Sequence, residues 1–334
     1  MSLELMRQLR DVTKSVNGMI DKILGAEQEP RVLYRASRHL IEAGGKRLRP
    51  FMVMKSCEIV GGRSEDSLPV AAAVELLHNF TLIHDDIMDG DSRRRGAPTV
   101  HVLWGTPIAI NAGDLLFAKV YDSVIHHIDT ERVPVERVIW VLDILSEATI
   151  AICEGQTLDM LYEERETISE VEYLDMIGKK TAALLKASAQ AGAIVGGGSR
   201  SQIDRLGSFA YQAGLAFQIV DDILGLTADE KTLGKPVGSD IREGKRTLII
   251  AHALSHANDK QRRLILSTLG DRDASPDRAR EVTETIRSLG AIDYAAGRAK
   301  GLIEEAKLQL SLFPDSPAKR LFLDLSDFIL SRSY

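Results

Sequence analysis

Cysteine is scarce in this chain of 334 residues, which contains only Cys57 and Cys153. A disulfide framework or a zinc site built from cysteine ligands needs more thiols than this. Both cysteines lie in apolar stretches with helix-like spacing. We therefore expect two buried free thiols in a reducing compartment, and we predict that the protein is cytoplasmic.

An excess of basic residues is also missing, because 42 lysines and arginines face 48 aspartates and glutamates. Binding to nucleic acid or to an anionic membrane normally requires a basic surface, and the composition argues against both partners. No N-terminal stretch has the basic-then-apolar order of a signal peptide, and no apolar run approaches the ~20 residues that span a bilayer. A greasy substrate therefore has to be held in an internal pocket.

Alternating strand patterns and flexible linkers are rare, and helical periodicity takes their place. Apolar residues recur at intervals of three and four over 3–24, 68–87, 138–161, 203–224 and much of 281–330. Prolines stand near the expected helix starts, where a missing N–H costs nothing. Ser67, Thr106 and Ser275 precede three of them and are predicted to be caps or near-caps.

One internal echo bears on domain organisation. An aspartate pair ends an apolar helix at Asp85–Asp86 and again at Asp221–Asp222, and each pair is followed by a charged loop that contains glycine. The chain is longer than the roughly 100–200 residues of a typical domain. The echo nevertheless favours an all-α fold in which residues 1–334 form a single large helical bundle with two similar inner helices.

The segment 'LLHNFTLIHDDIMDGDSRRRG', residues 76–96, combines carboxylates with arginines. Asp85 and Asp89 are four residues apart, which on a helix stacks them on one face with Cβ atoms about 5–6 Å apart. Two such carboxylates repel each other unless a cation lies between them, and oxygen ligands suit magnesium. Arg94 and Arg95 match phosphate oxygens. The segment predicts a metal-bridged phosphate beside an arginine clamp; a solvated helix end is the alternative.

The segment 'FQIVDDILGLTADEKTLGKPVGSD', residues 217–240, repeats this layout. Gln218 lies three residues before Asp221, on nearly the same face of a helix. Lys235 and Lys245 lie in the charged stretch that follows. If this helix faces the first one, Asp221 completes a carboxylate cage for several magnesium ions; a polar helix terminus is the alternative.

A third segment, 'GGKRLRP' at 44–50, places three cations after a tight glycine turn: Lys46, Arg47 and Arg49. It is suited to a second diphosphate without metal, and a basic surface loop is the alternative. Two lysines and a threonine at 179–181 suit a diphosphate or an exposed helix start equally. No pattern for nucleophilic catalysis stands out.

In their order along the chain these segments resemble the trans-prenyltransferases, which make farnesyl, geranylgeranyl and longer polyprenyl diphosphates. The motifs are 'GGKRLRP', 'DDIMDGDSRRRG', 'KT', 'FQIVDD' and 'GKPVGSDIREGKRTL'. The resemblance covers nearly the whole chain. It implies the isoprenoid synthase fold, a helical bundle around a deep central cavity, with several bound Mg²⁺ ions and usually a homodimer.

The resemblance also implies roles for individual residues. The implied catalytic set is Asp85, Asp86, Asp89, Asp221, Asp222 and Lys180, of which Asp85, Asp89 and Asp221 are the metal ligands. The positions that hold the allylic diphosphate are Arg94, Lys180, Thr181, Gln218, Lys235 and Lys245. Those that hold isopentenyl diphosphate are Lys46, Arg49, His78 and Arg95.

One position departs from the family pattern. The second motif usually ends in a third aspartate, and Gly225 stands there in this chain. We expect either that water, Asp229 or Asp240 compensates or that one metal ion binds more weakly, and in both cases that the protein remains active. The implied reaction ionises the allylic diphosphate, joins the cation to the double bond of isopentenyl diphosphate and then eliminates a proton.

Product length is predicted from the residues before the first aspartate motif, Phe80, Thr81 and Leu77. An aromatic five residues before Asp85 and a small residue four before it resemble short-chain synthases of the archaeal geranylgeranyl type. We predict geranylgeranyl diphosphate as the product, with farnesyl or longer products as the alternatives and ordinary core packing as the plainer interpretation of Phe80.

Two other functions have to be weighed. A class I terpene cyclase would share the first aspartate motif but has no use for a second diphosphate pocket, so 'GGKRLRP' argues against it. A non-catalytic subunit of a heteromeric synthase would be expected to carry a degraded first motif. That motif is intact here, and Gly225 is the one feature that favours such a subunit.

Overall fold

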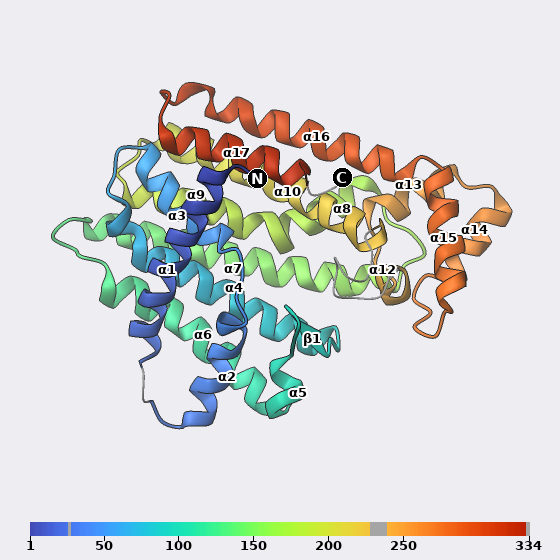
Figure 1. Cartoon of the computed structure of the whole chain (residues 1–334), viewed down its shortest axis with the longest axis horizontal. Coiled ribbons are helices and arrows are strands. Elements are labelled where there is room, and N and C mark those ends of the chain that lie inside the picture. The colour runs from blue at the N-terminus through green and yellow to red at the C-terminus, as the bar shows by residue number, and fades with distance from the viewer. Residues whose placement is uncertain (26–27, 228–238, 332–334) are drawn as a thin grey trace.

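The computed structural model describes residues 1–25, 28–227 and 239–331, and this part of the chain is almost entirely helical (Figure 1). Its one sheet is an antiparallel pair of two-residue strands, β1 (Arg93–Arg94) and β2 (Ala97–Pro98). The prediction of an all-α fold is confirmed.

The helices of the first half of the chain are α1 (Leu3–Leu24), α2 (Arg31–Glu42), α3 (Leu48–Ile59), the 3₁₀ turn η1 (Ser64–Ser67), α4 (Leu68–Met88), α5 (Val100–Trp104), α6 (Thr106–His127) and α7 (Val135–Glu163). Those of the second half are α8 (Glu170–Ile177), the π-helical η2 (Gly178–Ala182), α9 (Ala183–Val195), α10 (Arg200–Thr227), α12 (Ser239–Glu243), α13 (Leu248–His256), α14 (Asp259–Leu266), α15 (Pro276–Ser288), α16 (Ala291–Gln309), η3 (Leu310–Leu312) and α17 (Pro317–Ser331).

The long periodic stretches of the sequence correspond to α1, α4, α7 and α10. Apolar periodicity is the main determinant here, because each of these helices buries a face in a shared interior. Ser275 caps α15 as predicted, since its side chain accepts a hydrogen bond from the N–H of Arg278. Ser67 and Thr106 lie at the starts of α4 and α6 without making a side-chain cap bond.

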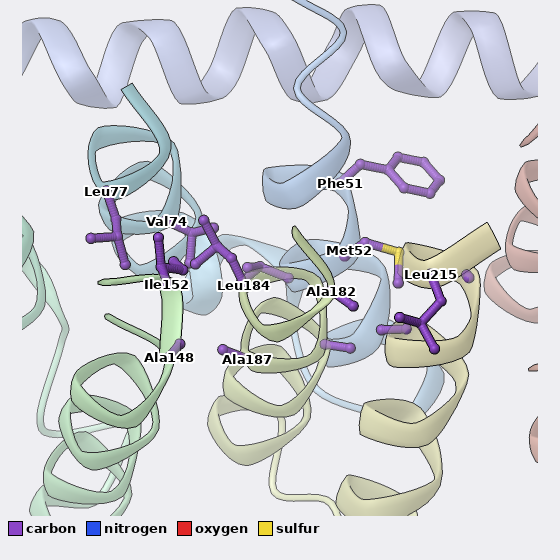
Figure 2. Packing of buried hydrophobic residues seen from close by; sticks show 14 of the residues in the cluster. Phe51, Met52, Val74, Leu77, Ala148, Ile152, Ala182, Leu184, Ala187 and Leu215 are labelled. Carbon is purple, nitrogen blue, oxygen red and sulfur yellow. The ribbon is translucent and has the colours of Figure 1, made fainter. Parts of the chain in front are cut away.

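The interior is formed mainly by α3, α4, α7, α9 and α10, whose apolar side chains meet between the helices (Figure 2). Leu77 of α4, Ile152 of α7 and Leu184 of α9 point into this shared core. Glycine permits the closest approach, because a Cβ at Gly192 of α9 would lie 1.9 Å from the carbonyl oxygen of Val53 in α3. Two helices can pack at this distance only where one of them lacks a side chain.

The remaining helices surround this interior. Helices α16 and α17 run along one side of the bundle, at the top of Figure 1, and α14 and α15 lie at one end. Helix α16 packs along α10, and α6 packs along α4. Within the described ranges, no helix is long and apolar enough to cross a membrane.

The two cysteines have different surroundings. Cys57 is fully buried in α3, and burial raises the pKa of its thiol to about 12. Cys153 is exposed on α7, so the expectation that both thiols are buried is wrong for this residue. The helical period explains the difference, because Cys153 follows the exposed Ile150 by three residues whereas Ile152 faces the core.

Candidate active site

A cavity of about 510 Å³ opens where α3, α4, η2 and α10 meet the loop that carries β1. It is lined by Arg49, His78, Thr81, Leu82, Asp85, Asp91, Arg93, Arg94, Arg95, Gly96, Lys180, Thr181, Phe217, Gln218 and Asp221. A second cavity of about 210 Å³ adjoins it and shares Asp85, Asp91, Arg94, Lys180, Thr181 and Gln218 with it. The three motif segments predicted from the sequence therefore converge on one continuous hollow.

The aspartates of the first motif lie at the end of α4. Asp85 lines both cavities, and Asp89 caps the helix, lines the smaller cavity and donates its N–H to the Asp85 carbonyl at 2.8 Å. Burial, followed by repulsion from Asp89, raises the pKa of Asp85 to about 6. A crowded, partly desolvated pair of carboxylates of this kind suits a divalent cation.

Asp86 faces away from that pair. Its side chain is almost fully buried and accepts a hydrogen bond from Nε of Arg94 at 2.5 Å. Burial raises the pKa of Asp86 although Arg94 acts against this. Arg94 also lies 3.6 Å from a carboxylate oxygen of Asp91. Asp86 thus anchors the loop that carries Arg94 to the end of α4.

The aspartates of the second motif lie within α10. The prediction that the pair ends its helix is wrong, because α10 continues to Thr227 and Gly225 is buried inside it. Asp221 lines the larger cavity and Asp222 the smaller one. The continuing helix places the next residues in the core, so Gly225 is helix interior and not part of either lining.

Several predicted compensating and binding residues fall outside what the structure covers. Lys235 and Asp229 lie outside the described residues, as does the side chain of Asp240. Lys245 lines the smaller cavity, and its Nζ lies 3.1 Å from a carboxylate oxygen of Glu243. The predicted set for the allylic diphosphate is therefore represented by Arg94, Lys180, Thr181, Gln218 and Lys245, all at the cavity walls.

Lys180 stands at the junction of the two cavities on the π-helical segment η2. Its Nζ lies 2.5 Å from Oδ2 of Asp159 in α7. Burial acts to lower the pKa of Lys180, but Asp159 and Asp85 outweigh it and the pKa is raised. Lys180 thus stays cationic beside the carboxylates, where it can bind a phosphate oxygen.

The segment 'GGKRLRP' turns as predicted, with φ of 98° at Gly44 and 146° at Gly45. The expectation that its three cations are all presented to a ligand is wrong for Arg47. That side chain is buried, lies 2.8 Å from Glu75 in an ion pair and donates to the Ile41 carbonyl. Arg47 has left-handed backbone (φ 50°) just before α3, which directs it inward.

Of the remaining cations in this segment, Arg49 reaches the cavity and Lys46 does not line it. Lys46 is exposed, with Nζ 4.9 Å from the centre of the Phe328 ring. Arg49 is joined at the cavity wall by His78 and Arg95, and Nη1 of Arg49 lies 3.2 Å from Nε2 of His78. We call Arg49, His78 and Arg95 the basic pocket.

Burial disfavours the charged forms of the three side chains in the basic pocket. Burial lowers the pKa of Arg49 to about 10, and burial together with Arg49 holds the pKa of His78 well below its usual range. Burial also lowers the pKa of Arg95, which donates to the Leu40 carbonyl at 2.8 Å. No acceptor contacts Nε of Arg49 within the described residues. A buried, unmet donor among cations is suited to an anion such as a diphosphate.

The three residues predicted to set product length lie in different surroundings. Thr81 lines the larger cavity. Phe80, the residue before Thr81, is half-buried and packs on Phe117 of α6, with ring centres 5.1 Å apart. Leu77 is fully buried, near Ile152 of α7 in Figure 2.

Three residues of α7 lie at the site but were not predicted from the sequence. A Cβ at Gly155 would lie 2.3 Å from the backbone nitrogen of Lys180, so this glycine lets η2 rest directly on α7. Nε2 of Gln156 lies 3.5 Å from Asp89, and Asp159 pairs with Lys180. An isolated glycine inside a long apolar helix, followed by a glutamine and an aspartate, was the available signal. Tyr173, which lines the smaller cavity, carried no such signal.

In the described part of the chain, no three histidine, cysteine or carboxylate side chains are close enough to hold a metal ion by themselves. Asp85 and Asp89 on one side and Asp221 on the other nevertheless fit a cation that completes its coordination with phosphate oxygens. This is the usual arrangement for magnesium, which takes one or two carboxylates together with the phosphates of its substrate.

Known proteins are similar to this chain in sequence and in fold. A family model described as polyprenyl synthetase matches residues 30–286. The chain is 45% identical over 332 residues to a short chain isoprenyl diphosphate synthase of Methanothermobacter thermautotrophicus, covering 98% of this chain and 100% of the relative. It is 41% identical over 334 residues to a geranylgeranyl diphosphate synthase of Methanosarcina mazei, with both chains covered in full. A geranylfarnesyl diphosphate synthase of Aeropyrum pernix is 41% identical over 309 residues, covering 91% of this chain and 95% of that protein.

Solved structures agree. The geranylgeranyl pyrophosphate synthetase of Pyrococcus horikoshii superposes with a TM-score of 0.92 at 43% identity, covering 98% of each chain. A geranylgeranyl pyrophosphate synthase of Corynebacterium glutamicum, described as complexed with isoprenyl diphosphate and magnesium, superposes with a TM-score of 0.88 at 28% identity, covering 98% of this chain and 99% of that one. The bundle therefore has the isoprenoid synthase fold, and the chain belongs to the polyprenyl synthetase family of prenyltransferases.

Proposed function

We propose that this protein is a magnesium-dependent prenyl diphosphate synthase that condenses isopentenyl diphosphate with an allylic diphosphate and makes geranylgeranyl diphosphate. The observation that carries the proposal is the lining of one cavity by two opposed sets of groups. The carboxylates Asp85 and Asp221 lie on it together with Lys180, and the basic pocket lies on it as well. A cyclase needs one diphosphate site, whereas a condensation needs two.

The carboxylates suit the allylic diphosphate. Asp85, Asp89 and Asp221 would hold Mg²⁺, which when bound neutralises the charge of the departing diphosphate. Arg94, Lys180 and Lys245, together with Lys235, would bind the remaining phosphate oxygens, and Thr181 and Gln218, which line both cavities, would complete this set at the reacting end of the allylic diphosphate. Charge stabilisation of a leaving group by fixed cations is a strong contribution to catalysis.

The basic pocket suits isopentenyl diphosphate. Arg49 and Arg95 are cationic and His78 is neutral near pH 7, because burial lowers its pKa. Lys46 follows the same turn and would reach the outer phosphate. In this position the double bond of isopentenyl diphosphate attacks the allylic cation, and the proton is lost to the released diphosphate. No protein nucleophile is required, and enclosure by the bundle limits the access of water.

A twenty-carbon product is supported by the names of the relatives from Methanosarcina mazei and Pyrococcus horikoshii. The relative from Aeropyrum pernix, named as a geranylfarnesyl synthase, makes a longer product the main alternative. Farnesyl diphosphate is the alternative product with a shorter chain. The pair Phe80 and Phe117 supports a floor for the growing chain between α4 and α6.

The test is product analysis of the purified protein with magnesium, isopentenyl diphosphate and each allylic primer in turn. We expect one discrete twenty-carbon diphosphate, formed only when isopentenyl diphosphate is present. A product made from an allylic diphosphate alone would indicate a cyclase. A folded protein that elongates no primer would indicate a non-catalytic subunit and would give Gly225 a disabling effect.

Replacing Phe80 with alanine should lengthen the product beyond twenty carbons, because it removes a ring from the proposed floor. Loss of this half-buried ring opens space at the proposed floor and destabilises the fold by up to roughly 3 kcal/mol. Chromatography of the dephosphorylated products measures chain length, and thermal unfolding confirms that the variant is folded at the assay temperature. An unchanged product distribution in a folded variant would assign Phe80 to the core instead.

We also propose that residues 1–334 form a single catalytic domain and that the enzyme is a cytoplasmic homodimer. Adjacent helices α6 and α7 expose Ile110, Ile125, Ile139 and Ile150, a pattern that suits burial against a second copy. Light scattering should then give twice the 36.7 kDa of the chain. A mass of one chain at assay concentration would contradict the dimer.

A further inference from the structure

Three hydrogen bonds link Thr181, which lines both cavities, to Tyr173, a residue of the smaller cavity that no sequence motif contains. Thr181 donates from Oγ1 to Oε1 of Gln218 at 2.8 Å. Gln218 donates from Nε2 to Oδ1 of Asp222 at 2.9 Å. Tyr173 of α8 donates its hydroxyl to Oδ2 of the same carboxylate at 2.6 Å. Three elements (η2, α10 and α8) are thus connected by one continuous chain of side-chain hydrogen bonds, which we call the Tyr173 relay.

The relay runs in one direction. Both carboxylate oxygens of Asp222 accept hydrogen bonds, one from the amide nitrogen of Gln218 and the other from the hydroxyl of Tyr173. The amide oxygen of Gln218 then faces Thr181, and the Thr181 hydroxyl has to donate to that oxygen. The proton of Thr181 is therefore directed away from the cavity, and the lone pairs of its oxygen are left facing inward, where Thr181 lines both cavities.

Tyr173 fixes the far end of the relay. It is fully buried, and among the described residues its hydroxyl makes one hydrogen bond, the one to Asp222. Burial, followed by the charge of Asp222, holds the pKa of Tyr173 well above its usual range. The hydroxyl thus keeps its proton near neutral pH and donates it to Asp222.

We propose that Tyr173 and Asp222 are positioning residues that set the amide orientation of Gln218 and thereby direct the oxygen lone pairs of Thr181 into the cavity. An electron-rich oxygen at that point stabilises the positive charge that develops on the allylic carbon, whereas an inward O–H would oppose it. This inference rests on the proposed function. It gives Asp222 a task different from that of Asp221, although the two residues are neighbours in one motif.

Removing the donor tests one end of the relay. Tyr173→Phe deletes one oxygen and should lower kcat by about 3- to 10-fold, as expected for the loss of one oriented hydrogen bond, with KM for both substrates changed less than about twofold. Tyr294→Phe is the matched control. The Tyr294 hydroxyl also donates to a carboxylate, that of Glu170, at a site outside both cavity linings. Its kcat should stay within about twofold of wild type.

Reversing the relay gives a sharper test. In Asp222→Asn the buried Tyr173 hydroxyl keeps an acceptor for its proton only when the new amide oxygen faces it, since an amide nitrogen in that place would donate to the tyrosine oxygen and leave the tyrosine proton unmet. The new amide nitrogen therefore faces Gln218. Gln218 then has to turn over, and its own amide nitrogen faces Thr181. The Thr181 hydroxyl then accepts from Gln218, and its own O–H bond points into the cavity. We expect kcat to fall roughly 100-fold, the size of effect seen when an oriented dipole at a reacting centre is lost.

The double variant separates this mechanism from a merely structural role. Adding Tyr173→Phe to Asp222→Asn removes the donor that forces the reversed orientation, so the asparagine can again present its oxygen to Gln218. We expect kcat to rise about 3- to 10-fold above that of Asp222→Asn, even though the melting temperature falls further because the hydrogen bond of the buried Tyr173 hydroxyl is lost. Gain of activity together with loss of stability is the signature of the relay.

Each outcome has a clear meaning. If the double variant is less active than Asp222→Asn, Tyr173 only supports the fold and the proposal is overturned. If Tyr173→Phe raises KM without lowering kcat, the relay positions substrate and not the reacting centre, which also overturns it. If the wild-type protein elongates no primer, the proposed function fails first, and that result is seen before any variant is compared.

Discussion

Replacing Asp85 with asparagine should make the metal-free protein more stable while nearly abolishing its activity. Burial, followed by repulsion from Asp89, raises the pKa of Asp85 to about 6, so near pH 7 the ionised side chain is a cost to the fold. Two pKa units correspond to about 3 kcal/mol, and asparagine keeps the shape without the charge. We expect the free energy of unfolding to rise by about 2–3 kcal/mol and kcat to fall at least about 1,000-fold.

The pH dependence of this stability follows from the direction of the pKa shift. The folded protein binds the proton of Asp85 more tightly than the unfolded chain does, so the penalty is fully present above pH 6. It shrinks as the pH falls, and it vanishes below the ordinary pKa of an aspartate. Urea unfolding in the presence of a chelator should therefore show a large difference between variant and wild type at pH 7.5 and a small one at pH 4.

Magnesium should reverse this order. A cation held by Asp85 and Asp89 offsets their repulsion, so wild type should gain stability when magnesium and a non-hydrolysable diphosphate are added, and Asp85→Asn should gain less. Asp143→Asn, at an exposed position of α7, serves as the matched control and should change neither quantity appreciably. Equal stability of Asp85→Asn and wild type at pH 7.5 without metal would contradict a burial cost at Asp85.

The sequence was sufficient for the helices because their determinant is local. Apolar residues at intervals of three and four predicted α4 and α10, and the structure buries those faces. It was also sufficient for the two carboxylates Asp85 and Asp89, since a four-residue spacing on a helix dictates a shared face. In both cases the information lies within one turn or two of the chain.

What the sequence could not supply was the direction of side chains at irregular backbone. Arg47 and Arg49 are two residues apart in one basic motif, yet the left-handed conformation at Arg47 directs it into an ion pair with Glu75, and Arg49 reaches the cavity. The motif contains no signal for this division. The choice depends on Glu75, which lies in another helix and becomes a partner only when α3 and α4 pack together.

Residues that act through a partner distant in sequence were missed for the same reason. Tyr173 looks like ordinary apolar surface of a short helix until α8 packs against α10 and its hydroxyl meets Asp222. Asp159 becomes part of the site only because it pairs with Lys180, across the contact between α7 and η2 that Gly155 permits. Such pairs are properties of tertiary packing, and the isolated Gly155 in α7 is the one local signal of either contact.

Replacing Arg49 with methionine should separate the two substrates kinetically. The Arg49 guanidinium lies at the wall of the cavity beside His78 and Arg95, so under the proposed function its loss removes a charge-assisted hydrogen bond to isopentenyl diphosphate. Such bonds are worth about 1.5–3 kcal/mol. We expect KM for isopentenyl diphosphate to rise roughly 30- to 100-fold, while KM for the allylic primer changes less than about threefold.

The same substitution should stabilise the ligand-free protein, because burying the positive charge of Arg49 costs folding free energy. Burial lowers the pKa of Arg49 to about 10, and methionine fills much of the volume without a charge, so the free energy of unfolding should rise by up to about 3 kcal/mol at pH 7. Arg280→Met, at an exposed position of α15, is the control for changing net charge and should alter neither KM. If Arg49→Met raised both KM values equally, the basic pocket would serve both diphosphates, and the division of the cavity into two substrate sites would be wrong.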